Sequence, residues 1–150
     1  MQTWRAFRRL DPADRRLAVE TAALLAATRI GLRVAGLRRW KTRVMRRAVR
    51  KVSPSPGAEQ MAAARKIVRI QERVVRHLTW HASCLERSLA LWWQLNRRGI
   101  AAEMRIGARK EAGRFEAHAW VEVGNVVLND SGETHRHFAP FDGSILSLET

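Results

Sequence analysis

Apolar residues near the start of the chain recur at three- and four-residue steps, the period of an α-helix. The pattern follows Asp11-Pro12, which resembles a helix cap with proline at the first helical position, and it reaches Val34 before Gly36 ends it. The positions that share this stripe are Leu17, Thr21, Leu24, Leu25, Thr28 and Leu32. We predict one helix up to Val34 and a second, basic helix over residues 37–52.

Prolines interrupt the helical pattern at residues 53–57, because a residue that precedes proline is pushed out of the helical region. We place the main boundary there, with a basic helical region over residues 1–52 and a separate domain over residues 53–150. A third helix is predicted from Ala58 to about Leu78, with its apolar residues on one face.

The fourth predicted helix has a sharp start signal. Ser83-Cys84-Leu85-Glu86 matches the S-x-x-E capping box, in which the serine and glutamate side chains bond the free backbone N–H groups of the first turn. Arg97-Arg98-Gly99 matches a helix end, with basic residues followed by glycine. Cys84 is therefore expected in the first turn of this helix.

After Gly99 the apolar period changes from helical to alternating, which indicates strands. We predict strands at residues 102–106, 115–123 and 126–130, a polar loop at residues 107–113, and a turn near Gly124-Asn125. Helices followed by an antiparallel sheet predict an α+β fold.

The charge of the chain is unevenly distributed. The net charge is +14, and residues 1–51 hold 15 lysines and arginines against Asp11, Asp14 and Glu20. This basic part fits a solvated helix face or a surface for an acidic partner about equally well. Nucleic acid is less favoured, because no glycine-rich phosphate loop or aromatic platform accompanies the charge.

The number of cysteines and the hydropathy of the chain indicate where in the cell the protein is located. One cysteine among 150 residues forms no intramolecular disulfide, and the start of the chain lacks the pattern of a secretory signal. The most apolar stretch, residues 17–37, contains Glu20, Arg29 and Arg33, which do not suit a membrane span. We expect a cytoplasmic protein without membrane association.

Cys84 and His118 are the candidate catalytic residues. A helix N-terminus favours the thiolate form of a cysteine, and its free N–H groups can receive an oxyanion. His118 shares a strand face with Trp120 and Glu122, so a base is presented from the sheet beside the helix cap. Either Asp130 or Asn129 on the next strand can orient the imidazole.

Each of these residues also has a simpler interpretation. A cysteine near a helix start is by itself more often a small packed residue, and a strand histidine is more often structural. The combination and its order favour catalysis. Trp80 and Trp120 are candidate substrate-binding residues, although packing into the core explains Trp80 more simply.

Metal and cofactor chemistry has no support in the pattern. The remaining histidines have no companions at metal-ligand spacing; they are His77, His81, His135 and His137. We expect no metal and no cofactor for the chemistry.

Several segments together resemble the B2 proteins of lasso peptide biosynthesis, which are leader peptidases related to transglutaminase-like cysteine enzymes. They are Ser83 to Leu91, Arg98-Gly99-Ile100, Ile106 to Arg109, Ala117 to Val123 and Val127 to Asp130. The resemblance implies a papain- or transglutaminase-like core, in which the nucleophile-bearing helix packs on a small antiparallel sheet after basic N-terminal helices.

Carried over by position, the resemblance implies Cys84 as nucleophile, His118 as general base and then acid, and Asp130 as the residue that orients it. The implied enzyme is a cysteine protease that removes the leader of a lasso peptide precursor, with residues 53–150 as its peptidase domain. A capping glutamate at Glu86 is particular to this chain, since the family often has another residue there.

The resemblance also implies partners. They are the precursor peptide, a separate B1-type leader-recognition protein and the macrolactam-forming cyclase, and ATP is associated with leader removal in the family although no ATP motif is visible here. Two alternatives stay open: acyl transfer to an amine, and a basic nucleic-acid-binding protein whose sheet is not catalytic.

The turn at Gly124-Asn125 decides which polar residue meets His118. A strict two-residue loop places Asn129 diagonal to His118 and turns Asp130 away, whereas a longer or bulged loop reverses this. Because the resemblance implies Asp130, we predict a three-residue or bulged loop.

Overall fold

A computed structural model describes residues 11–48, 56–130 and 134–141 of the chain. Three helices come first, and four strands with a short 3-10 helix follow. In chain order the elements are α2 (Pro12–Ala48), α3 (Ala58–Val75), α4 (Cys84–Arg97), β1 (Ala102–Glu111), β2 (Arg114–Val123), β3 (Val126–Val127), η1 (Thr134–His137) and β4 (Ala139–Pro140). The strands form one antiparallel sheet in the order β3-β2-β1-β4. The predicted α+β fold is confirmed.

The first helical segment is broken where the sequence predicts. Gly36 has φ 69° and ψ 167°, which is not helical, so α2 consists of two helices joined across a kink. Asp11 caps the first turn, because its Oδ1 accepts a 2.6 Å hydrogen bond from the backbone N–H of Ala13. Within the described residues, no helix combines the length and the apolar content that a membrane span requires.

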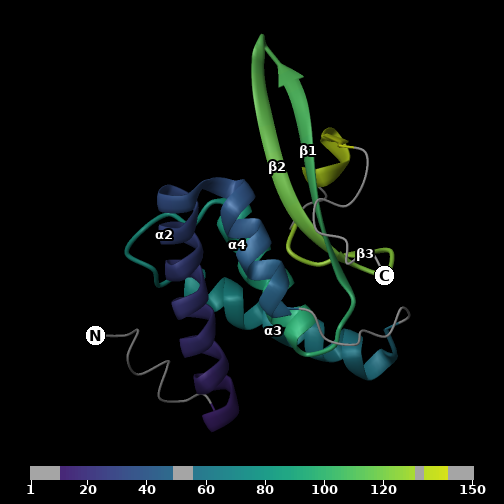
Figure 1. Cartoon of the computed structure of the whole chain (residues 1–150). Coiled ribbons are helices and arrows are strands. Elements are labelled where there is room, and N and C mark those ends of the chain that lie inside the picture. The colour runs from purple at the N-terminus through teal and green to yellow at the C-terminus, as the bar shows by residue number, and fades with distance from the viewer. Residues whose placement is uncertain (1–10, 49–55, 131–133, 142–150) are drawn as a thin grey trace.

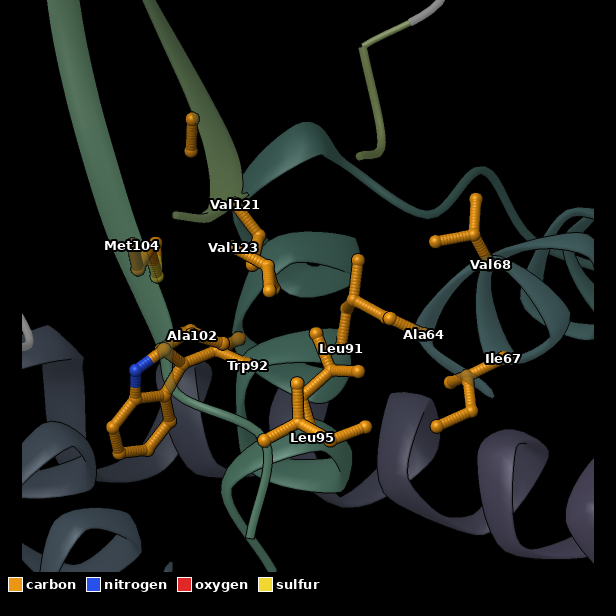
Figure 2. Packing of buried hydrophobic residues seen from close by; sticks show 13 residues of the cluster. Ala64, Ile67, Val68, Leu91, Trp92, Leu95, Ala102, Met104, Val121 and Val123 are labelled. Atoms are coloured by element: carbon orange, nitrogen blue, oxygen red, sulfur yellow. The ribbon is translucent and has the colours of Figure 1, made fainter. Parts of the chain in front are cut away.

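The hydrophobic core lies around α4. Helix α2 packs on α3 and α4, and α4 in turn packs on β1 and β2. Figure 2 shows Leu91, Trp92 and Leu95 of α4 beside Met104 and Val121 of the sheet. From α3, Ala64, Ile67 and Val68 close the other side. Helix α2, which belongs to the predicted region 1–52, is thus part of the same helical layer. The predicted boundary between residues 52 and 53 lies outside the described residues.

The predicted loop at residues 107–113 is wrong, since β1 continues as a strand to Glu111 and turns at Ala112-Gly113. The hairpin of β1 and β2 projects well beyond the helices (Figure 1). Its tip is exposed on both faces, so its strands have no apolar alternation to reveal them. Backbone pairing from Gly107↔His118 to Glu111↔Arg114 holds the tip together.

The predicted loop between β2 and β3 is also wrong. Val123 pairs with Val126, so Gly124-Asn125 is a strict two-residue turn, and Gly124 has a positive φ of 60°. Strand β3 is only two residues long instead of the predicted five. After a last backbone bond from Leu128 N–H to the Val121 carbonyl, at 2.9 Å, the chain leaves the ladder.

Candidate active site

Cys84 is the first residue of α4, as predicted. The capping box is formed in both directions: the Glu86 N–H donates to Ser83 Oγ at 3.2 Å, and the Ser83 N–H donates to Glu86 Oε2 at 2.9 Å. Cys84 is free and partly buried against the core. The thiol therefore lies at a helix N-terminus whose cap is held by side chains.

A polar bridge holds the same helix against β2. Ser88 is fully buried, and its Oγ donates a 2.9 Å hydrogen bond to the Ala119 carbonyl. Ser88 lies four residues after Cys84, so the two side chains share one face of α4. Ala119 follows His118 directly, so the helix face that carries Cys84 meets β2 beside His118.

His118 projects from the other face of β2 and is enclosed by aromatic rings. It stacks on Trp120 at a centroid distance of 6.0 Å and contacts the Phe138 ring at 5.3 Å. Gly107, its partner on β1, leaves room for this packing, because a Cβ there would lie 2.9 Å from the Cβ of Phe138. The imidazole is thus held in one orientation, with 19% of the side chain exposed.

Asp130 connects His118 to a second histidine. Its Oδ1 lies 3.4 Å from His118 Nε2, which is within ion-pair reach but long for a hydrogen bond. Its Oδ2 lies 2.7 Å from His135 Nδ1 and also accepts a short hydrogen bond from the His135 backbone N–H. With the carboxylate at Nε2, Nδ1 is the nitrogen of His118 that remains for a thiol.

The surroundings of Asp130 favour its charged form. Burial alone raises the pKa of its carboxyl, and the two hydrogen bonds from His135 lower it, together with the charges of His118 and His135. The lowering contributions outweigh burial, so the pKa of Asp130 lies below its ordinary value. A carboxylate beside an imidazole stabilises the imidazolium and fixes the orientation of the ring.

Asn129 takes a different place from Asp130. Its Oδ1 accepts a 2.8 Å hydrogen bond from the Val121 N–H, and its Nδ2 donates to Ser88 Oγ at 2.9 Å. The amide thus extends the Ser88 bridge between the sheet and α4, while the carboxylate of Asp130 approaches His118. Asp130 reaches His118 because the chain leaves the ladder after Leu128, without the longer loop that we predicted.

Comparison with known proteins places the chain in a family. The model of the transglutaminase-like superfamily matches residues 24–141, most of the chain. The chain belongs to the transglutaminase-like superfamily. The match begins inside α2, so the superfamily region includes part of the basic N-terminal segment as well as the sheet.

One relative is more specific in name but matches a shorter stretch. Over 59 residues the transglutaminase-like chain is 42% identical to the microcin J25-processing protein McjB of Escherichia coli. The aligned part covers 39% of this chain and 27% of that protein, so the match spans about a quarter of the relative's length. Both matches are consistent with the resemblance to lasso peptide B2 proteins, and no solved structure matches the chain significantly.

The two candidate substrate-binding tryptophans lie in different surroundings. Trp120 is 3% exposed, and its Nε1 donates a 2.7 Å hydrogen bond to Glu122 Oε1, so it mainly supports the His118 ring. Trp80 is half-buried under the Arg29 guanidinium. A substrate contact for either tryptophan stays a prediction.

Sequence reasoning missed the residues that support this candidate site. His135 was weighed only as a metal ligand, and the described residues contain no group of three potential metal ligands. Ser88 and Asn129 lie 41 positions apart, so no local period connects them. The signal in the sequence that could have indicated this bridge is Ser88 itself. It is a polar residue on the face of the predicted helix that also carries Leu85 and Leu89, and a buried hydroxyl needs a hydrogen-bond partner.

Proposed function

We propose that this protein is a cysteine peptidase that removes the leader from a lasso peptide precursor. The observation that carries the proposal is the approach of Asp130 to His118 Nε2. His118 lies on β2, and this strand is bonded to α4, the helix that begins with Cys84. This arrangement supplies a nucleophile, a base and an orienting carboxylate in one superfamily scaffold. The partial match to McjB, a processing protein, supports a peptide precursor as substrate.

The chemistry follows from the roles of the three side chains. The Cys84 thiolate attacks the carbonyl carbon of the scissile bond, and N–H groups of the first turn of α4 receive the oxyanion. The protonated His118 gives its proton to the leaving amine as the C–N bond breaks, which leaves a thioester. Water then attacks that thioester with His118 as base, so the C–S bond breaks and the leader leaves as a carboxylic acid.

Asp130 has an orienting role in this scheme. A carboxylate at Nε2 selects the tautomer in which Nδ1 is directed at the thiol, and it stabilises the imidazolium that forms during acylation. His135 holds the carboxylate from the other side through its ring and backbone nitrogens. Substitution of Asp130 is expected to lower kcat much more than it changes KM.

The test is cleavage of a synthetic precursor, followed by mass spectrometry, with a leader whose penultimate residue is threonine, as the resemblance to B2 proteins implies. A separate leader-binding partner is included, since the resemblance implies one. Wild-type protein is expected to release leader and core, and Cys84→Ala, His118→Ala and Asp130→Asn are expected to lose at least about a hundredfold in rate. Full activity in folded Cys84→Ala protein contradicts the proposal.

A second candidate, acyl transfer to an amine, is favoured by the superfamily itself. Both reactions pass through the same thioester, so only the acceptor distinguishes them. The cleavage reaction is repeated in ¹⁸O-labelled water with an excess of a primary amine such as putrescine. Label in the new carboxylate of the leader supports hydrolysis, and a leader–amine conjugate without label supports acyl transfer.

A further inference from the structure

Arg29 of α2 contacts the segment that carries Cys84 at three points. Its Nη1 donates a 3.2 Å hydrogen bond to the His81 carbonyl and lies 3.5 Å from Glu86 Oε1. Its guanidinium carbon lies 5.8 Å from the centre of the Trp80 ring. These contacts lie on both sides of Cys84 in the sequence, so one side chain holds the approach to the helix and its first turn.

The Glu86 carboxylate links Arg29 to the cap of α4. The Glu86 side chain is only 10% exposed and also accepts the hydrogen bond from the Ser83 N–H. A carboxylate that is largely removed from water needs a nearby positive charge, and Arg29 provides it. The geometry of the cap and the balance of charge in the first turn of α4 therefore both depend on a residue 55 positions before Cys84 in the chain.

We propose that Arg29 is a positioning residue for Cys84, which holds the Trp80–Glu86 segment in place and balances the Glu86 carboxylate in the helix turn that begins with Cys84. This inference rests on the proposed function only in taking Cys84 as the nucleophile. It gives the basic helix α2 a role in the active site that its charge alone does not indicate. Arg29 itself does not touch the reacting atoms.

The charged groups around the first turn of α4 explain why the balance matters. Glu86 and Arg87 lie on α4 itself, and Arg29 reaches the turn from α2. On β2, Ala119 accepts the Ser88 bond, and His118 precedes it in the chain. Without Arg29, the Glu86 carboxylate, two residues after Cys84 in the chain, keeps the bond from the Ser83 N–H but loses its positive partner. A negative charge there disfavours the thiolate and opposes the helix N-terminus.

The single cysteine makes a direct test possible, because a thiol-alkylating reagent such as iodoacetamide reports on Cys84 alone. Alkylation rates are measured from about pH 5 to pH 10 in wild type, Arg29→Ala, Arg29→Lys, Glu86→Gln and the double variant Arg29→Ala/Glu86→Gln. The matched control is Arg33→Ala, since Arg33 is an exposed arginine one turn further along the same helix. Far-ultraviolet circular dichroism and urea unfolding check each variant.

Arg29→Ala is expected to slow alkylation near pH 7 by about three- to tenfold and to move the midpoint of the profile to higher pH. Glu86→Gln alone moves the midpoint to lower pH, and the double variant returns it close to wild type, because glutamine keeps the capping bond without the charge. Arg29→Lys retains part of the effect, and Arg33→Ala retains the wild-type profile.

A wild-type profile in Arg29→Ala, or an unchanged midpoint in Glu86→Gln, overturns the inference. If Arg29→Ala does not fold, Glu86→Gln and Arg29→Lys decide it, since the first removes the charge that Arg29 balances and the second keeps the cation. Alkylation needs no peptide substrate. Failure of peptide cleavage with a shifted profile therefore contradicts the proposed function alone, and cleavage with unshifted profiles contradicts the role of Arg29 alone.

Discussion

Ser88→Ala is the substitution that tests how the helix that carries Cys84 is held against the strand that carries His118. Ser88 Oγ is the centre of the bridge, because it donates to the Ala119 carbonyl and accepts from Asn129 Nδ2, both at 2.9 Å. Alanine fits the same space but offers no hydrogen bond. Asn129 Nδ2 then loses its partner in a partly buried position, while its Oδ1 keeps the bond to the Val121 N–H.

The size of the effect follows from the number of bonds lost. A buried polar atom left without a partner costs about 1–3 kcal/mol, so loss of both bonds predicts a decrease of about 2–4 kcal/mol in the free energy of unfolding. For a chain of this length that corresponds to a fall of about 4–16 °C in Tm. A buried serine that only filled space would lose a few tenths of a kcal/mol instead.

Urea unfolding followed by circular dichroism measures this difference, with a lower midpoint and an unchanged slope expected for Ser88→Ala. Thr79→Ala is the control, because it removes a hydroxyl from an exposed position just before α4 and is expected to stay within about 0.5 kcal/mol of wild type. The double variant with Asn129→Ala should lose less than the sum of the single losses, because the two residues share a bond. A wild-type midpoint for Ser88→Ala refutes the bridge.

Further predictions concern the site and its enclosure. Cys84→Ala should unfold at a urea midpoint close to wild type while precursor cleavage, measured by mass spectrometry, is lost; more than trace activity sinks the mechanism. The pKa of Asp130 is lowered in the folded protein, so its stabilisation is present above about pH 4 and is lost as the pH falls through the folded value. Asp130→Asn should therefore flatten the acid side of a plot of urea midpoint against pH, and an unchanged acid side counts against it. In Gly107→Ala the new Cβ meets the Cβ of Phe138 at 2.9 Å and the Ala139 carbonyl oxygen at 3.0 Å, so a loss of about 1–3 kcal/mol is expected in the same assay. Addition of a separate leader-binding protein should raise the cleavage rate strongly by delivering the substrate, and equal rates with and without every candidate partner would argue against that requirement.

Local signals were sufficient for the part of the site that lies on α4. The S-x-x-E pattern predicts the cap, and the structure forms it between Ser83 and Glu86 in both directions. Such a box involves residues three apart, so its chemistry is contained in the sequence pattern. The glycine breaks at Gly36 and Gly99 are local for the same reason, and both residues have a positive φ.

Alternation along β2 also predicts correctly which residues share a face. His118 stacks on Trp120, and Trp120 bonds Glu122, so the three lie together, while Ala119 and Val121 are buried in the core. The tip of the hairpin was missed, because solvent on both faces removes the alternation that identifies a strand. Ion pairs such as Arg109 with Glu116, at 2.6 Å, connect its strands there, and these become evident only from the register.

The contacts that complete the site are non-local, and no period in the sequence encodes them. Arg29 lies 52 positions from the His81 carbonyl that it bonds. Asp130 and His135 are only five positions apart, but their contact depends on the packing of η1 against β2. Such contacts form only when separate elements pack together, so sequence patterns indicate the positions of the candidate residues Cys84 and His118 better than the contacts around them.

Asp130 lies near His118 although the hairpin differs from the one that we predicted, and this shows where the reasoning from strand register failed. That reasoning assumed that β3 continues to Asp130, in which case a strict two-residue turn places Asn129 near His118. Instead the ladder ends after Leu128, and the Asn129 side chain takes the place of a backbone carbonyl by accepting the bond from the Val121 N–H. Because the ladder ends before Asn129, the side chain of Asp130 no longer has to follow the alternation of a strand. Asp130 can then approach His118 while Asn129 bonds Ser88, so two adjacent residues serve the site and the bridge behind it.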